Sequence, residues 1–205
     1  MNIFTLSCSQ SRTFFCFFSL NVNKKSTLID ISSHQIVNSI VNLNTRKVLE
    51  RLPSELRKVQ KDPIDLIVVD KGPGSFTGIR TAVAFAKGLS HGANIPILSL
   101  SILDALCLKK FIQHNYKPKN YSAKISARNG NVYKSEMVLP NNIAESFNRT
   151  AIKFGKSKTY DEVDVDTINA LTTLGVYKYL TSGPDNVLLV VPLYGRQVNI
   201  TIPRK

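Results

Sequence analysis

Residues 65–90 read DLIVVDKGPGSFTGIRTAVAFAKGLS, and this stretch decides the fold. An apolar run ends at Val69, which is typical of a strand that is covered on both faces of its sheet. A loop with three glycines and a proline follows, and apolar side chains then recur at helical spacing from Ile79 to Leu89. A second apolar run, IPILSL, occupies 95–100. This order predicts a strand, a loop, a helix and a parallel strand, which together form a right-handed crossover unit.

The segments before this unit predict strands and one further helix. Short β-rich runs at 3–8 and 13–20 predict an opening hairpin, and 26–32 is a candidate third strand. Residues 36–41 fit a helix by their spacing and a strand by their β-branched side chains, so both interpretations stay open. Apolar positions within 48–59 fall on one helical face, which predicts an amphipathic helix.

Two lobes are expected from the distribution of polar segments. A polar stretch after residue 112 is expected to separate an N-terminal lobe, residues 1–112, from a smaller C-terminal α/β lobe, residues 113–205. In the second lobe, Asn129-Gly130 predicts a tight turn between two strands. Asp166 is predicted to cap a helix that follows a polar stretch.

Composition narrows the class of protein. Of the 205 residues, 43% are hydrophobic and 20% are charged, which is typical of a folded globular chain and argues against disorder. Cys8, Cys16 and Cys107 have no partner at CxxC spacing, which argues against a disulfide framework or a structural zinc site. No segment has the length of a membrane span, so we expect a cytoplasmic protein without a membrane partner.

The formal net charge of +13 indicates a polyanionic partner such as nucleic acid, or a lysine-rich drift in composition. The basic residues are scattered along the chain rather than gathered in one stripe with aromatic residues. Both interpretations therefore stay open.

The glycine-rich loop has two interpretations. A helix N-terminus preceded by glycines can bind an anion, which makes the loop a candidate phosphate site. A Walker A loop needs lysine and a hydroxyl residue after its last glycine, and Ile79 and Arg80 stand there instead. A dinucleotide fingerprint would need one residue fewer between the second and third glycines. The other interpretation is a tight turn that lets the helix pack on its strand.

The loop and its surroundings resemble a known family. GPGSFTGIR at 72–80, followed by AVAFAKGLSHGANIPILSLSILDAL, closely resembles the signature of the TsaB (YeaZ) family. Weaker similarity continues in ISARNGNVY at 125–133, in PLYGR at 192–196 and in the opening MNIFTLSCS. The resemblance spans most of the chain. It implies the two-lobed α/β fold of the actin-like, Hsp70-like and sugar-kinase-like ATPases, which is related to RNase H.

The resemblance also implies a function. TsaB proteins are non-catalytic subunits that bind the catalytic protein TsaD and, with the ATPase TsaE, support threonylcarbamoylation of adenosine 37 in tRNAs that read codons beginning with A. We therefore expect a TsaD heterodimer and no cofactor bound by this chain alone, with ATP or ADP and Mg²⁺ at the level of the complex. A homodimer of the isolated chain and tRNA binding through the basic surface stay open. The alternative is an independent ATPase-like protein that uses the GPGSFTG loop to bind a nucleotide.

The resemblance identifies two groups of candidate site residues. The signature loop, close to a possible phosphate or nucleotide, comprises Gly72, Gly74, Ser75, Thr77 and Gly78. The predicted partner interface lies on two helices and comprises Leu49, Arg51, Leu52, Leu56, Arg80, Val83 and Lys87. No catalytic residue and no metal ligand is predicted.

Two departures from the family pattern argue against ATP hydrolysis. The aspartate of the family's first strand falls at Ser7, and the aspartate of its DARRG segment falls at Ser126. Mg²⁺ prefers carboxylate ligands beside nucleotide phosphates, so both replacements remove a candidate ligand. The histidines, His34, His91 and His114, have no HExxH spacing, which argues against a metallopeptidase.

Overall fold

The computed structural model describes residues 1–20, 35–38, 43–44, 48–59, 62–139, 148–149 and 151–195. The candidate strand at 26–32 lies outside these residues. None of the described helices has both the length and the apolar character that a membrane span requires.

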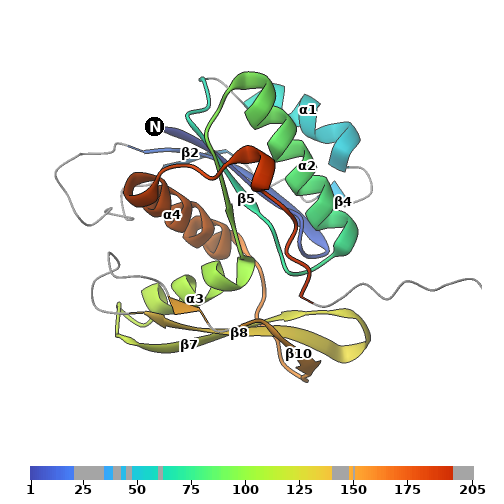
Figure 1. Cartoon of the computed structure of the whole chain (residues 1–205), viewed down its shortest axis with the longest axis vertical. Coiled ribbons are helices and arrows are strands. Elements are labelled where there is room, and N and C mark those ends of the chain that lie inside the picture. Colours follow the sequence, from blue (N-terminus) through green and yellow to red (C-terminus); the bar gives the residue numbers. More distant parts are fainter. Residues whose placement is uncertain are drawn as a thin grey trace, which may run out of the picture.

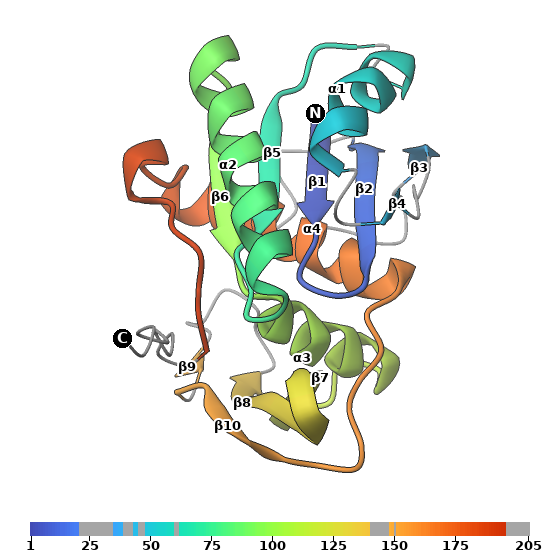
Figure 2. The same cartoon turned by 90° about the vertical axis from the view of Figure 1, so that its right-hand side faces the viewer.

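The first sheet contains the predicted crossover unit (Figures 1 and 2). Its strands are β1 Asn2–Ser7, β2 Arg12–Ser19, β3 Gln35–Asn38, β4 Leu43–Asn44, β5 Leu66–Asp70 and β6 Ile97–Leu100. They run in the order β3-β2-β1-β5-β6, with β4 also paired to β2. The β1–β2 hairpin is antiparallel, whereas β5 is parallel to both β1 and β6. The opening hairpin and the parallel strands are confirmed, and the described part of 36–41 is strand.

Helices cover both faces of this sheet. On one face lie α1 Val48–Val59 and α2 Phe76–Ala93, against side chains such as Phe4 and Ile67. On the other face lie α3 Ile102–Gln113 and α4 Val165–Ser182, against side chains such as Ile3 and Val68. Because neighbouring residues of a strand point to opposite faces of the sheet, a strand that is covered on both faces needs apolar residues at consecutive positions.

The second sheet packs on the far side of α3 (Figure 1). Its strands are β7 Lys119–Ser126, β8 Asn131–Leu139, β9 Asn148–Arg149 and β10 Lys153–Lys156, in the order β10-β8-β7 with β9 paired to β8. The predicted turn joins β7 to β8, where Asn129 and Gly130 have φ angles of 61° and 67°. The strands β9 and β10 lie in a stretch that the sequence presents only as polar.

The C-terminal part returns to the first sheet. Helix α4 packs on α3 and on strands of the first sheet, and the 3-10 turn η4 Val187–Leu189 lies beside α2. The predicted cap of α4 is wrong by two residues. Asp164, not Asp166, accepts the Thr167 N–H and completes a capping box with the Thr167 hydroxyl. The division into lobes at residue 112 stays a prediction.

Candidate functional site

The signature loop joins β5 to α2 and is tied to the β1–β2 turn. Ser75 N–H donates to the Ser9 carbonyl oxygen over 2.6 Å. The Ser75 hydroxyl oxygen in turn accepts the Gly78 N–H at 3.3 Å and so caps α2. Gly72 and Gly78 are buried, whereas Ser75 and Thr77 are exposed. The loop therefore forms the tight turn that the sequence allows and also presents a helix N-terminus to solvent.

A buried carboxylate holds the start of the loop. Asp70 is wholly buried, and its Oδ2 accepts the Ser7 hydroxyl at 2.6 Å while its Oδ1 accepts the Gly72 N–H at 2.7 Å. Burial raises the pKa of Asp70, and the hydrogen bond from Ser7 partly opposes this rise. Asp70 is not among the site residues predicted from the sequence. The pattern that could have identified it is an acidic residue directly after a buried strand and before the glycines.

Asp70 lies beside the position where the resemblance expects a carboxylate on β1. Leu6 and Val69 are partners in the parallel β1–β5 pair, so the next residues along the two strands, Ser7 and Asp70, are neighbours. The carboxyl group is therefore present at the end of the sheet, but on β5 instead of β1. It is wholly buried and accepts hydrogen bonds from Ser7 and Gly72, so it holds the start of the loop.

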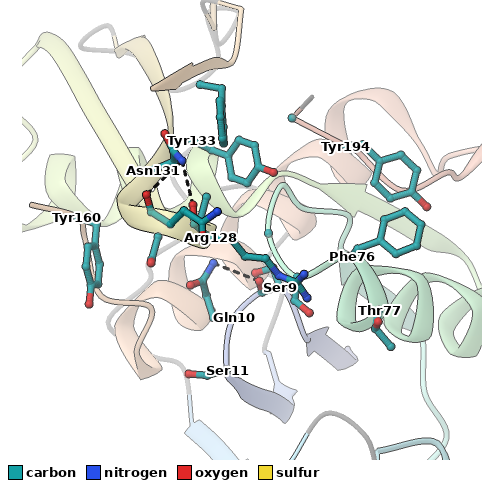
Figure 3. A pocket seen from close by; sticks show the side chains of 17 residues that line it. Ser9, Gln10, Ser11, Phe76, Thr77, Arg128, Asn131, Tyr133, Tyr160 and Tyr194 are labelled. Atoms are coloured by element: carbon teal, nitrogen blue, oxygen red, sulfur yellow. Dashed lines mark hydrogen bonds between the residues drawn. The ribbon is translucent and has the colours of Figure 1, made fainter. Parts of the chain in front are cut away.

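A cleft of about 780 Å³ opens next to the loop (Figure 3). It lies between the β1–β2 turn, the start of α2, the β7–β8 turn and the C-terminal segment. Its lining comprises Ser9, Gln10, Ser11, Gly74, Ser75, Phe76, Thr77, Ser126, Ala127, Arg128, Asn129, Asn131, Tyr133, Phe154, Tyr160, Tyr194 and Gly195. Gly74, Ser75 and Thr77 of the predicted loop set are thus at the cleft, together with Ser126.

The cleft combines aromatic rings with one cationic side chain. Among the described residues that line it, Arg128 alone carries a charge, and Figure 3 shows this side chain extending toward Ser9. At the rim, the Phe76 and Tyr194 rings stack with centroids 5.0 Å apart, and the Arg80 guanidinium lies 5.2 Å from the Phe76 centroid. The cleft can hold a planar or anionic group, but this lining offers no carboxylate for a metal ion or for proton transfer.

The predicted interface residues divide into exposed and buried sets. Arg51 and Arg80 are exposed, whereas Leu56 and Val83 belong to the core under the first sheet. Lys87 is half-buried, and its Nζ donates to the carbonyl oxygens of Leu188 at 3.2 Å and of Val190 at 3.0 Å. The side chains of Leu49 and Leu52 lie outside the described residues.

The exposed face of α2 is nearly bare of bulky side chains between its ends. Ala84 and Gly88 are exposed one turn apart, and a Cβ atom added to Gly88 would meet no atom within 4 Å. Another helix can approach such a face closely, because no side chain keeps the two backbones apart.

The reactivity of the three cysteine thiols tests whether these side chains are buried as described. Burial raises the pKa of Cys8, Cys16 and Cys107 to about 12 each. The thiolate is the reactive form, so at pH 8 the folded protein is expected to leave a disulfide reagent such as dithiobis(nitrobenzoate) unreacted for minutes. After unfolding in guanidinium, three thiols should react at once. Rapid reaction of any thiol in the native protein would contradict the described packing.

Comparison with known proteins identifies the family. The family model described as "TsaD: tRNA N6-adenosine threonylcarbamoyltransferase" matches residues 42–162. The "tRNA threonylcarbamoyladenosine biosynthesis protein TsaB" of Haemophilus influenzae is 39% identical over 75 residues, which are 37% of this chain and 31% of that protein. The protein of the same name from Buchnera aphidicola subsp. Schizaphis graminum is 28% identical over 147 residues, 71% of this chain and 67% of that protein.

The matched segment thus spans about a third of the Haemophilus protein and about two thirds of the Buchnera protein. Among solved structures, "YeaZ from Pseudomonas aeruginosa" has a TM-score of 0.63 at 16% identity, with 94% of this chain and 99% of that chain covered. A second solved chain from the same organism, described by its similarity to peptidase YEAZ, has a TM-score of 0.66 at 16% identity, with 95% and 99% covered. These two likenesses show the fold.

The family model described as TsaD covers more than half of the chain. The relatives named TsaB resemble the chain in sequence, and the YeaZ structures resemble it in fold. The α/β architecture is therefore the actin-like and Hsp70-like one that the resemblance implies, and this chain belongs to the TsaB (YeaZ) family.

Proposed function

We propose that this chain is a non-catalytic subunit in the biosynthesis of threonylcarbamoyladenosine in tRNA. In this role it binds a TsaD protein and, together with TsaE, supports the transfer of a threonylcarbamoyl group to adenosine 37 of tRNAs that read codons beginning with A. Membership of the TsaB family supports the pathway, and the lining of the cleft supports a role without chemistry of its own.

The non-catalytic role is supported chiefly by the hydrogen bonds that the Asp70 carboxyl group accepts within the protein. An enzyme that hydrolyses ATP needs carboxylates that reach a metal ion beside the phosphates. Here the carboxyl group at the end of β5 is buried and accepts hydrogen bonds from Ser7 and Gly72. Ser126 faces the cleft where the resemblance expects the second carboxylate. The site therefore fits a loop that is held rigid better than a loop that takes part in catalysis.

Helix α2 supports the choice of pairing surface. Its exposed face has Ala84 and Gly88 in the middle and Arg80 near the start. A partner helix can approach over the small residues, while Arg80 and Arg51 of α1 can contact polar groups at the rim. The buried Leu56 and Val83 support this surface from beneath by packing in the core.

We expect the substitution Gly88→Gln to weaken TsaD binding by at least about 30-fold, because a long side chain would separate the two helices at the centre of the surface. The fold should tolerate the change, since Gly88 has open space around its Cβ position and glutamine favours helix more than glycine does. Isothermal titration calorimetry with the TsaD of the same organism measures the effect.

Gly155→Gln on β10 is the matched control. Gly155 is also exposed and also has no atom within 4 Å of an added Cβ, but it lies on the second sheet. The control should bind TsaD like the parent chain. Equal affinity of the parent and Gly88→Gln, with both folded, would remove α2 from the pairing surface.

A further inference from the structure

The second sheet aligns three lysines in one row across three strands. Lys153 of β10 is the register partner of Lys134 of β8, and Lys134 is the register partner of Lys124 of β7. Directly paired residues of neighbouring strands point to the same face. Tyr121, Ala123 and Ile125 of β7 are buried toward α3, so Lys124 and its row lie on the opposite, outward face.

The three aligned lysines destabilise the isolated sheet unless an anion lies over them. Like charges directly opposite each other destabilise a sheet, and neighbouring strands are only about 4.8 Å apart. Among the described residues, Lys134 has an ion pair with Glu136 at 2.7 Å, whereas neither Lys124 nor Lys153 has one. The pKa of Glu136 is lowered chiefly by the Lys134 hydrogen bond, with a smaller contribution from Lys153. Glu136 thus faces two of the three lysines, and the nearby Asp161 carboxylate accepts the Lys124 backbone N–H and pairs with Lys110.

The surroundings of the row extend the positive charge. Residues 117–160 contain nine lysine and arginine residues and two glutamates, so more than half of the formal net charge of +13 lies in this segment. Lys158, just after β10, is also exposed, whereas Lys156 points to the opposite face of β10. No described helix covers the outward face, because α3 packs on the other one (Figure 1). Folding therefore gathers lysines that are scattered along the chain.

The chemistry of the face favours RNA over an apolar protein partner. Its outward residues on β7 and β8 are polar or charged except Val132 and Val138, which leaves little apolar area for a protein interface. Lysine is a mobile point charge that suits phosphate oxygens. Tyr160 is 60% exposed and lies beside Lys124 at the β7 edge, whereas Phe154 pairs with Tyr133 and points to the opposite face. An exposed aromatic ring beside a lysine allows an unpaired base to stack while the cation binds the backbone.

We propose that the outward face of the second sheet, with Lys124, Lys134 and Lys153 at its centre, binds the sugar–phosphate backbone of an RNA strand. Figure 2 shows α1 and this sheet at opposite ends of the molecule. The exposed middle of α2 and this face consist of different residues, so the isolated chain can be tested for RNA binding.

The test is the salt dependence of binding to two fluorescent RNA probes, an unmodified tRNA transcript and a 20-nucleotide single strand. Each phosphate contact contributes about 0.7 to 0.9 to the slope of log K against log salt. The double variant Lys124→Gln/Lys153→Gln should lower this slope by about 1.4 to 1.8. It should also bind about tenfold more weakly at 50 mM salt, in line with the loss of two contacts.

The double variant Arg12→Gln/Arg57→Gln removes the same charge from β2 and α1 and is the matched control. Both arginines are exposed, and the control should keep the slope of the parent chain. If both double variants lost RNA affinity and salt slope equally, the RNA would be attracted by the net charge of the chain alone, and the proposed site would be wrong. It would also be wrong if the parent chain bound neither RNA at 50 mM salt, or bound anionic lipid vesicles but no RNA. Thermal melts monitored by circular dichroism establish that each variant is folded.

Discussion

Gly74→Ala is expected to lower the free energy of unfolding by about 3 kcal/mol or more. A Cβ atom at this position would overlap the carbonyl oxygen of Ser9, and the backbone has a φ angle of +155°, which non-glycine residues rarely adopt. The Ser9 carbonyl cannot move away easily, because it accepts the Ser75 N–H at 2.6 Å. Urea unfolding followed by circular dichroism measures the loss.

Gly88→Ala is the control for this substitution, since the same change is made in the same segment. Gly88 lies in α2, with no atom within 4 Å of the added Cβ and no unusual φ angle. Alanine should therefore stabilise the helix by about 0.5–1 kcal/mol. If both variants were as stable as the parent chain, the loop would not be in contact with the β1–β2 turn as described.

Asp70→Ala is expected to cost about 2–3 kcal/mol, because it leaves the Ser7 hydroxyl and the Gly72 N–H buried without their acceptor. Asp70→Asn should stay within about 1 kcal/mol of the parent chain at pH 7. The asparagine oxygen can still accept from Gly72, and its amide can donate to the Ser7 oxygen. A loss in the Asp70→Asn variant as large as that in the Asp70→Ala variant would mean that the negative charge, and not the hydrogen bonds, holds the loop.

The pH dependence separates these two possibilities further. The folded-state pKa of Asp70 is raised above its ordinary value of 3.8, so the folded protein keeps this proton where the unfolded chain has lost it. The protonated carboxyl therefore contributes stability below pH 3.8, and this contribution disappears as the pH rises through the folded-state pKa. Relative to Asp70→Asn, the parent chain should lose stability with rising pH in this range. A gain would contradict the raised pKa.

The sequence predicts the first sheet well because its elements have local signals. The strand ending at Val69, the glycine loop and the helix that follows are each visible within one window of residues, and so is the Asn129-Gly130 turn. The spacing of apolar residues within a short window distinguishes a helix from a strand. A strand that is covered on both faces can be recognised from its continuous apolar run alone, without knowing which strands pair with it. The crossover unit could therefore be placed to within a few residues.

The candidate sites depend on contacts that no local window contains. The row formed by Lys124, Lys134 and Lys153 exists only through the register of three strands, one of which the sequence presents as a polar stretch. The role of Asp70 depends on the pairing of β1 with β5. Similarly, an apolar face in the sequence does not reveal whether it packs on the protein's own sheet, as Val83 does, or on a partner.

The most direct test of the proposed role is size-exclusion chromatography with light scattering on this chain mixed with the TsaD protein of the same organism, with and without ATP. We predict one species whose mass is the sum of one chain of each protein, and its disruption by Gly88→Gln but not by Gly155→Gln. Two separate peaks at the masses of the isolated proteins, under both nucleotide conditions, would contradict the role of this chain as a TsaD-binding subunit.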